Sequence, residues 1–493
     1  MFSRILIANR GEIAVRVIRA CRQMGIASVA VYADCDRDSL HVSLADFAYP
    51  LEGATPRAAY LDIEQLLKVA RRAGAEAIHP GYGFVSENPA LPEACVANGI
   101  TFIGPSADVI RRLGNKNQAR DAMKAAGLPL VPGSNLTQGE DVAQVAQQIG
   151  YPVLIKAAGG GGGRGMRKVD HPKDLDNLFQ QARSESLTSF GSDELFIEKY
   201  VVHPRHVEIQ VLGDSHGQAI YLGERECSIQ RRFQKMIEEA PSPVVTPELR
   251  QRMGQAAAKG AREVGYVGAG TFEFLVDKDL NFYFLEVNTR LQVEHPVTEQ
   301  VYGVDLVQAQ IEVAAGHPLP WKQEELKPRG WAFECRITCE DPYRNFLPCP
   351  GQVQQLRLPQ GAGVRLDTHL YPGYQVPQAF DSMVAKLITF GEDREQARRR
   401  MLGALAEFQI TGIPTSIPFH QQILEHPEFI AGNLSTHFIA DHLPHLARCS
   451  AGDIQELAAL AAALESLFSN APPAAAATRS EAQVWKEAGR VLR

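Results

Sequence analysis

The first hundred residues alternate short apolar runs with stretches in which apolar positions recur at helical spacing. Between the first two runs, Ile13, Val17 and Cys21 fall on one face of a predicted helix. Such alternation predicts a parallel sheet with helices on both faces. The runs that predict its strands are residues 4–8, 27–32, 77–79 and 99–103.

The turn after the first predicted strand lacks the sequence of a dinucleotide-binding fold. Residues 9–12 read NRGE, with one glycine where the fingerprint needs three. The pattern therefore disfavours a Rossmann oxidoreductase.

A second apolar run, residues 151–156, ends in Lys156 and is followed by five glycines at 159–163 and by Arg164. Backbone N–H groups of a glycine loop can approach phosphate oxygens closely, and a lysine supplies charge. No Gly-Lys-Ser/Thr ends the loop, so it is not a Walker A motif. A flexible linker is the alternative, but the preceding strand and Arg164 favour an ATP site.

Two strand-like runs, residues 271–276 and 282–287, flank a turn-rich segment and predict a β-hairpin. In a nearly symmetric register Glu273 faces Glu286, and like charges placed opposite each other are destabilising. A divalent cation between them reverses that sign, and carboxylate oxygens suit Mg²⁺. The alternative is two solvated glutamates, but the neighbouring Phe and Leu residues favour partial burial.

The second of these runs continues as an alternation of functional and apolar residues. If the chain stays extended, one face carries all the functional groups. Arg290 offers a fork that matches bicarbonate, and Glu294 could act as a general base. The residues of this face are Glu286, Asn288, Arg290, Gln292 and Glu294.

Other charged or nucleophilic features favour structural roles. Residues 225–239 hold four cations, which is typical of a solvated charged strip. His79 lies beside a turn and is interpreted as structural. The eight cysteines include no Cys-x-x-Cys, and the neighbours Cys335 and Cys339 lack the further paired Cys or His ligands of a zinc site. This predicts reduced, buried thiols in a cytosolic protein.

Length and composition limit the classes of protein to which the chain can belong. At roughly 150 residues per domain, 493 residues predict about three domains. Fifty Lys and Arg against 57 Asp and Glu give a net charge of −7, which disfavours nucleic-acid binding and leaves small anionic ligands open. Neither an apolar signal-peptide core nor a spanning segment is evident, so we expect a cytoplasmic protein without membrane contact.

Several of these motifs occur together in one known family. They closely resemble biotin carboxylase, the ATP-grasp component of biotin-dependent carboxylases, over residues 1 to about 445. The segments that carry the resemblance are residues 8–14 (ANRGEIA), 79–88 (HPGYGFVSEN), 156–167 (KAAGGGGGRGMR), 271–274 (TFEF) and 286–298 (EVNTRLQVEHPVT).

The resemblance implies a mixed α/β and α+β fold: an ATP-grasp domain between a Rossmann-like N-terminal domain and a biotin carboxylase C-terminal domain. The implied divisions are 1–113, 114–330 with a mobile lid at about 130–203, 331–445, and a linker and helical tail at 446–493. We expect the tail to contact a partner.

The resemblance also implies a reaction and partners. ATP, with Mg²⁺ or Mn²⁺, phosphorylates bicarbonate to carboxyphosphate, and the CO₂ released from it is captured by biotin on a biotin carboxyl carrier protein. A carboxyltransferase subunit is implied as well. So is a homodimer, with a helix at 11–23 carrying Arg16 and Arg19 near the dimer contact.

Site residues implied by the resemblance fall into five groups. ATP contacts are Lys116, Lys156, Gly161, Gly162, Gly163, Glu198, Lys199, Val201, His206 and Gln230. Metal ligands are Glu273, Glu286 and Asn288. The bicarbonate pocket is Lys235, Arg290, Gln292, Val293 and Glu294, and the biotin pocket is Tyr82 and Arg336. The catalytic residues are Glu294 as base, Arg336, Lys235 and Arg290.

The chain departs from the family at one visible position. Bacterial acetyl-CoA carboxylase subunits read Arg-Arg-His-Gln-Lys where this chain has Phe233 in residues 231–235. This change and the tail leave acetyl-CoA, another acyl-CoA or pyruvate open as final acceptor. Biotin must arrive on another protein, because the nearest match to a biotinylation motif, residues 122–125 (AMKA), lies mid-chain in a helical context.

Two alternatives remain open: another ATP-grasp ligase that joins a carboxylate to an amine, and a nucleotide-binding regulatory subunit without turnover. The presence of the metal pair, of Glu294 and of Arg336 disfavours the second.

Overall fold

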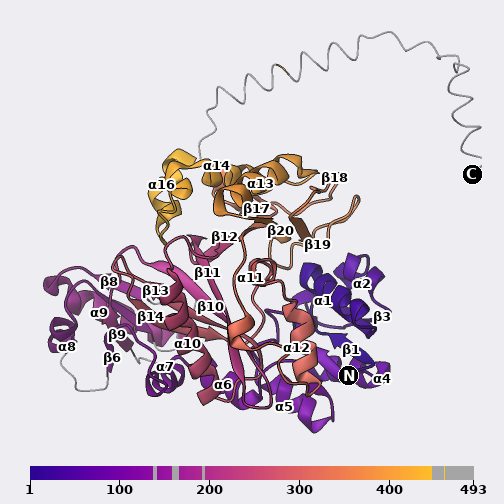
Figure 1. The fold of residues 1–493 in the computed structure, drawn as a ribbon, viewed down its shortest axis with the longest axis horizontal. Coiled ribbons are helices and arrows are strands. Elements are labelled where there is room, and N and C mark those ends of the chain that lie inside the picture. The colour runs from indigo at the N-terminus through magenta and orange to yellow at the C-terminus, as the bar shows by residue number, and fades with distance from the viewer. Residues whose placement is uncertain (137–141, 158–165, 191–194, 447–459, 461–493) are drawn as a thin grey trace, which may run out of the picture. The chain divides into compact units, whose positions relative to one another are not determined.

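The computed structural model describes residues 1–136, 142–157, 166–190, 195–446 and 460 (Figure 1). The expected ATP contacts Gly161, Gly162 and Gly163 lie outside the described residues, as does the expected tail except for its first residue and Leu460. The chain divides into two units, 1–446 and 447–493, and the description below concerns the first. Among the described helices, none is long and apolar enough to cross a membrane.

The N-terminal region is a five-stranded parallel sheet in the order β3-β2-β1-β4-β5, which confirms the predicted parallel arrangement. Its strands are β1 (Arg4–Ile7), β2 (Ala27–Tyr32), β3 (Phe47–Pro50), β4 (Ala77–His79) and β5 (Thr101–Phe102). Its helices are α1 (Gly11–Gln23), α2 (Leu40–Leu44), α3 (Pro56–Leu61), α4 (Ile63–Ala73), α5 (Ala90–Ala97) and α6 (Ala107–Gly114). Strand β3 was not predicted from the sequence; it is a short edge strand that ends in a proline, and its residues are exposed or only partly buried.

A four-stranded antiparallel sheet, in the order β6-β9-β7-β8, lies within the region expected to form the lid. Alternate residues such as Val153, Ile155 and Ile197 point into its apolar core. Its elements are β6 (Gly133–Leu136), α8 (Val142–Ile149), β7 (Val153–Ala157), β8 (Met166–Val169), α9 (Leu175–Phe190) and β9 (Leu195–Lys199).

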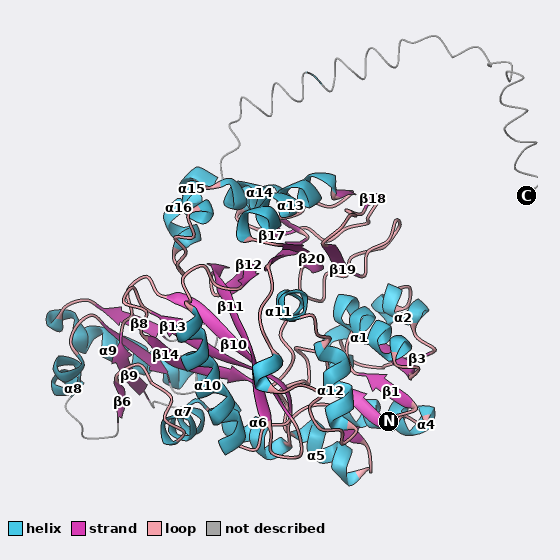
Figure 2. Cartoon of the chain, in the orientation of Figure 1, coloured by secondary structure: helices cyan, strands magenta, loops and turns pink. Residues whose placement is uncertain are grey.

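The largest element of the fold is an eight-stranded antiparallel sheet in the order β14-β13-β10-β11-β12-β15-β20-β19. In Figure 2, α10 (Pro247–Glu263) lies along β10 and β11 of this sheet. The strands are β10 (Arg205–Gly213), β11 (Ala219–Arg231), β12 (Gln234–Ala240), β13 (Gly268–Val276), β14 (Phe282–Asn288), β15 (Trp331–Thr338), β19 (Val364–Thr368) and β20 (Met383–Gly391).

The remaining helices and short strands complete this unit. The helices are α7 (Lys116–Ala125), α11 (His295–Tyr302), α12 (Leu306–Ala314), α13 (Arg394–Glu407), α14 (Ile417–Glu425), α15 (Pro427–Ile430) and α16 (Phe438–Leu446). Two two-stranded sheets pair β16 (Glu340–Asp341) with β17 (Leu347–Pro348), and β18 (Gln355–Arg357) with β21 (Gln409–Thr411).

The predicted hairpin is confirmed, but the predicted extended face after it is wrong. Strands β13 and β14 pair with Glu273 directly opposite Glu286. The strand then ends at Asn288, and Glu294 is the N-cap residue of α11. Pro296 in the first turn of that helix explains the change, since proline is favoured at helix starts.

The prediction of a solvated charged strip at residues 225–239 is also wrong. This segment forms β11, a two-residue turn and β12, and only the turn region is exposed. The side chains of Arg225, Glu226, Glu238 and Glu239 are buried in the eight-stranded sheet. Here each buried charge has an oppositely charged partner on a neighbouring element.

Candidate active site

One large cleft, with a volume of about 1280 Å³, gathers nearly all the expected site residues. Glu294 is the exception among those described, because it is fully buried beneath the cleft wall. The expected residues that line the cleft are Tyr82, Lys116, Lys156, Glu198, Lys199, Val201, His206, Gln230, Lys235, Glu273, Glu286, Asn288, Arg290, Gln292, Val293 and Arg336.

Lys235 connects three buried carboxylates at the cleft floor. It lies on β12 opposite Gln230 of β11, where the strand pair places its ammonium over the sheet. Its Nζ donates to Glu208 Oε2 at 2.6 Å, Glu273 Oε1 at 2.9 Å and Glu294 Oε1 at 2.6 Å. Burial alone would lower the pKa of Lys235, but the three carboxylates raise it well above its usual range. Lys235 therefore stays charged.

Glu208 and Arg225 were not anticipated from the sequence. Arg225 is fully buried, and its Nε donates to Glu208 Oε1 at 2.5 Å. Its other nitrogens donate to Gln210 and to Thr271. Glu208 thus links a structural arginine to Lys235 and holds the ammonium in place. The alternation of His206, Glu208 and Gln210 along β10 is the sequence signal that could have found this face.

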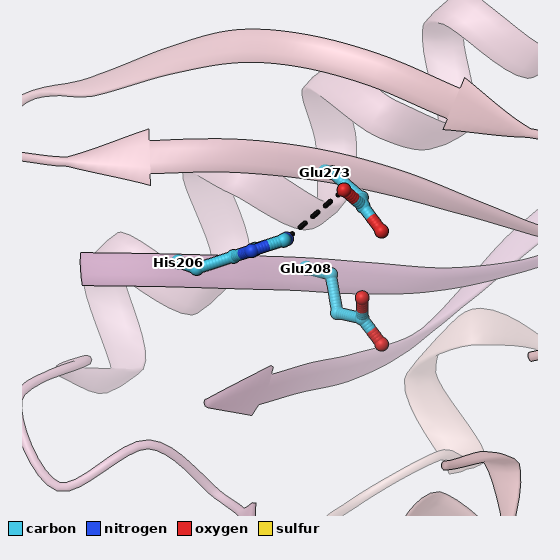
Figure 3. A group of neighbouring side chains, drawn as sticks. All are labelled: His206, Glu208 and Glu273. Carbon is cyan, nitrogen blue, oxygen red and sulfur yellow. Dashed lines mark ion pairs between the residues drawn. The ribbon is translucent and has the colours of Figure 1, made fainter. Parts of the chain in front are cut away.

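The expected metal ligands lie on the paired strands β13 and β14. Glu273 is buried and Glu286 is exposed to the cleft. Figure 3 shows Glu273 and Glu208 beside His206, whose Nε2 lies 3.0 Å from Glu273 Oε2. Although burial opposes it, Lys235 and His206 hold the pKa of Glu273 below its usual range. Desolvation in the cleft and the facing Glu273 carboxylate raise the pKa of Glu286.

This donor set fits a hard divalent cation. Two carboxylates face each other across a strand pair, and the pKa of Glu286 is raised in part by the repulsion that a cation would relieve. Asn288 lies beside them, with its Nδ2 donating to Glu273 Oε1 at 2.8 Å. Oxygen ligands of this kind are those that Mg²⁺ and Mn²⁺ prefer.

Arg290 lies just past the end of β14 and organises the next part of the cleft. Its Nη1 donates to Gln292 Oε1 at 3.0 Å and its Nη2 to Asn288 Oδ1 at 3.1 Å. Its Nε donates to Glu87 Oε2 at 3.0 Å, a contact that no motif in the sequence predicts. The turn thus brings Asn288, Arg290 and Gln292 together even though they do not lie along one extended strand.

Glu294 lies between two cations. Its Oε1 accepts from Lys235, and its Oε2 accepts from Arg336 Nη2 at 2.8 Å. Burial would raise the pKa of Glu294, but Lys235 and Arg336, with Arg225, hold it well below its usual range. Arg336 binds two carboxylates, since its Nε also donates to Glu238 Oε1 at 2.5 Å. Burial raises the pKa of Glu238 to about 7.

The expected nucleotide contacts come from the small sheet, from α7 and, in the case of His206 and Gln230, from β10 and β11 of the eight-stranded sheet. Lys156 pairs with Glu198 across β7 and β9. Desolvation lowers the pKa of Lys116, and Lys156 adds to that effect. The ammonium of Lys199 donates at 2.8 Å to the carbonyls of Gly150 and Tyr151, so its side chain braces the start of β7.

Tyr82 and Arg16 lie in different settings. Tyr82 lines the cleft with a buried hydroxyl that has no hydrogen-bond partner among the described residues.

On α1, the exposed Arg19 contrasts with Arg16, which is buried and pairs with Glu299 and Asp305 of its own chain, each at 2.8 Å. His79 is buried and its Nδ1 accepts from the Gly81 N–H, as a structural histidine would.

Three family models match consecutive parts of the chain. They are the biotin carboxylase N-terminal domain over residues 1–110, the ATP-binding domain of the carbamoyl-phosphate synthase L chain over 115–322, and the biotin carboxylase C-terminal domain over 334–441. Fold and cleft thus define an ATP-grasp ligase. The chain belongs to the biotin carboxylase family.

Similar proteins cover nearly the same span. Biotin carboxylase 1 of Bacillus subtilis is 51% identical over 442 residues, 89% of this chain and 98% of that protein. The biotin carboxylase of Haemophilus influenzae is 52% identical over 446 residues, 90% of this chain and 99% of that protein. The biotin carboxylase domain dimer of Hydrogenobacter thermophilus 2-oxoglutarate carboxylase, solved with MgADP, ADP and bicarbonate, is 45% identical with a TM-score of 0.86, covering 91% of this chain and 99% of that one.

Proposed function

We propose that this chain carboxylates biotin carried on a separate protein, using ATP and bicarbonate. The observation that carries the proposal is the position of Glu294, a buried carboxylate held between Lys235 and Arg336 beneath the cleft that contains the facing pair Glu273 and Glu286. Activation of bicarbonate needs a base and cations close to a phosphoryl-transfer site, and this cleft supplies both.

The phosphoryl-transfer end of the cleft lies toward the small sheet. Lys116 and Lys156 would neutralise ATP phosphates, and Glu273, Glu286 and Asn288 would hold Mg²⁺ or Mn²⁺. The bound cation supplies charge neutralisation on the transferring phosphoryl group. The remaining nucleotide contacts that we propose are Glu198, Lys199, Val201, His206 and Gln230, with Gly161, Gly162 and Gly163.

Bicarbonate is bound by Arg290, Gln292, Val293 and Lys235 in this proposal. Glu294 accepts its proton, a bicarbonate oxygen bonds to the γ-phosphorus, and the bond to ADP breaks. Carboxyphosphate then decomposes to CO₂ and phosphate. Exclusion of water from the cleft would protect this labile intermediate.

Biotin enters beside Tyr82. The phosphate takes the N1′ proton, Arg336 stabilises the resulting enolate oxygen, and N1′ bonds to the carbon of CO₂. Two cations hold the pKa of Glu294 low before substrates bind. Anionic bicarbonate and the enolate draw Lys235 and Arg336 toward themselves, which makes Glu294 a stronger base when it is needed.

The partners we propose are a biotin carboxyl carrier protein and a carboxyltransferase subunit, with a second copy of the chain forming a homodimer. We also propose the division into residues 1–113, 114–330, 331–445 and 446–493, with a lid at about 130–203. The dimer described for the Hydrogenobacter thermophilus domain supports the homodimer.

The test is ADP release from ATP and bicarbonate by the purified chain, with and without free biotin. Biotin-stimulated release supports the proposal. Release that depends on an added amine, and not on biotin, would instead identify a carboxylate–amine ligase. Nucleotide binding without turnover under any of these conditions would identify a regulatory subunit.

A further inference from the structure

The turn between β14 and α11 carries three members of the proposed bicarbonate site: Gln292, Val293 and Glu294. It belongs to neither a strand nor a helix, so no hydrogen-bond ladder fixes the direction of its peptide groups. Gln292 and Glu294 are buried, while Val293 lines the cleft. One backbone hydrogen bond, from the His295 N–H to the Gln292 carbonyl oxygen at 3.4 Å, closes the turn, and buried side chains add to it.

Two fully buried side chains contact the backbone carbonyl oxygens of the turn. His295 Nδ1 lies 2.7 Å from the Gln292 carbonyl oxygen. Lys386 Nζ, on β20, donates to the Val293 carbonyl oxygen at 2.8 Å. Two successive carbonyls of the turn are thus each held by a buried side-chain donor.

The protonation of His295 follows from its surroundings. Burial, together with the cations Lys386, Arg16 and Arg365, lowers the pKa of His295 well below its usual range, so the ring is neutral. A carbonyl only accepts hydrogen bonds, so the single ring proton belongs on Nδ1. His295 is therefore a fixed donor to Gln292.

Lys386 is itself fixed by the elements packed around it. Its Nζ lies 3.5 Å from Glu12 Oε2 and 3.9 Å from Asp367 Oδ2. On the sheet it is the register partner of Arg336 in β15. These contacts fix the position of the Lys386 ammonium, so it does not move together with the turn.

The geometry of a trans peptide converts these contacts into a direction. The Gln292–Val293 bond is trans, since the cis bonds among the described residues precede prolines. In a trans peptide the C=O and N–H point to opposite sides. Holding the Gln292 carbonyl on His295 therefore turns the Val293 N–H away from the buried His295, and Val293 itself lines the cleft.

We propose that His295 and Lys386 are positioning residues: His295 aims the main-chain N–H of Val293 at bicarbonate, and Lys386 anchors the next peptide group so that the turn keeps this conformation. This inference rests on the bicarbonate site assigned in the proposed function. An N–H pre-aimed at an anion needs no reorganisation when the anion binds, so its benefit appears in bicarbonate affinity.

The test compares two substitutions at one position. His295→Leu keeps similar volume and removes the donor, whereas His295→Asn keeps an N–H near the place of Nδ1. We expect His295→Leu to raise the KM for bicarbonate about tenfold or more, with the KM for ATP nearly unchanged. His295→Asn should restore most of the bicarbonate KM, because the donor and not the ring is required.

Two results would overturn the proposal: an unchanged bicarbonate KM in His295→Leu, or an equal rise in both variants, which would point to packing. If His295→Leu does not fold, the double variant Lys386→Met, Glu12→Gln tests the other donor without leaving the Glu12 carboxylate unpaired. The same rise in bicarbonate KM is expected there, and an unchanged value refutes the proposal.

Arg290→Ala separates this inference from the site on which it rests. A raised bicarbonate KM in Arg290→Ala with a normal value in His295→Leu overturns the positioning role alone. An unchanged value in Arg290→Ala overturns the bicarbonate site itself.

Discussion

Substitution of Glu294 by glutamine tests the base at the centre of the proposed reaction. Glutamine keeps the size of the side chain but removes its charge and its basicity. Glu294 is fully buried, with Lys235 at 2.6 Å and Arg336 at 2.8 Å on its two oxygens. The low pKa imposed by these cations keeps it ionised throughout the neutral range, so the wild-type base is always available.

The size of the expected effect follows from the role. Loss of a general base costs about 10²–10⁴ in rate, which corresponds to roughly 3–5 kcal/mol of barrier at about 1.4 kcal/mol per decade. We expect ADP release at saturating ATP, bicarbonate and biotin to fall at least about 10²-fold. Thermal unfolding of the variant verifies that the protein measured is folded.

Glu238→Gln is the matched control. Glu238 also accepts from Arg336 and is equally buried, but it does not contact Lys235. Burial raises its pKa to about 7, so at neutral pH the substitution removes about half of a charge, less than is lost with Glu294. We expect a loss of about tenfold or less. Equal losses in the two variants would mean that Glu294 serves only to hold Arg336, and near-normal turnover in Glu294→Gln would refute the base directly.

Further predictions concern metal, pH and backbone strain. Glu286→Gln should raise the Mg²⁺ concentration for half-maximal ADP release about tenfold, and an identical titration would count against the facing pair with Glu273 as ligands. Burial raises the pKa of Glu12 from 4.5 to about 7, so the folded state binds this proton more tightly and stability falls as pH rises through that interval. Glu12→Gln should therefore gain stability over wild type between pH 5 and pH 8, by up to about 3 kcal/mol in urea unfolding; equal differences at both values would contradict this. Phe233 is 64% exposed at a φ of +66°, so Phe233→Gly should stabilise the fold by about 1 kcal/mol, and a destabilised variant would show that the ring makes contacts that outweigh the strain.

The parts of the site that the sequence predicted are those fixed by local pairing. The short loop places Glu273 and Glu286 near each other on the paired strands, and an irregularity in the register between Glu273 and Phe274, which the spacing of the two runs does not reveal, brings them directly opposite. The strand beyond Asn288 was predicted wrongly because a turn can also produce an alternation of period two. Pro296 was the available signal that a helix starts there.

The parts that could not be predicted depend on pairing between distant segments. A glutamate such as Glu208 looks like a solvated charge until β11 and β12 bring Arg225 and Lys235 to it. Lys386 contacts the site from 93 residues away. Which face of a charged strand is buried depends on its neighbours in the sheet, and sequence spacing does not reveal those neighbours.

The eight-stranded sheet runs without interruption through the junction of two recognised sequence families. Strand β12 lies in the stretch matched by the ATP-binding model, and β15 enters the stretch matched by the C-terminal model at Glu334. The two strands pair along four residues each, from Ile237 with Cys335 to Ala240 with Ala332. Dividing the chain at this junction would leave two proteins whose edge strands expose unpaired backbone N–H and C=O groups. It would also separate Arg336 from Glu238. A chimaera with a related carboxylase should therefore exchange the two matched stretches together, because the sheet that they share is larger than either stretch.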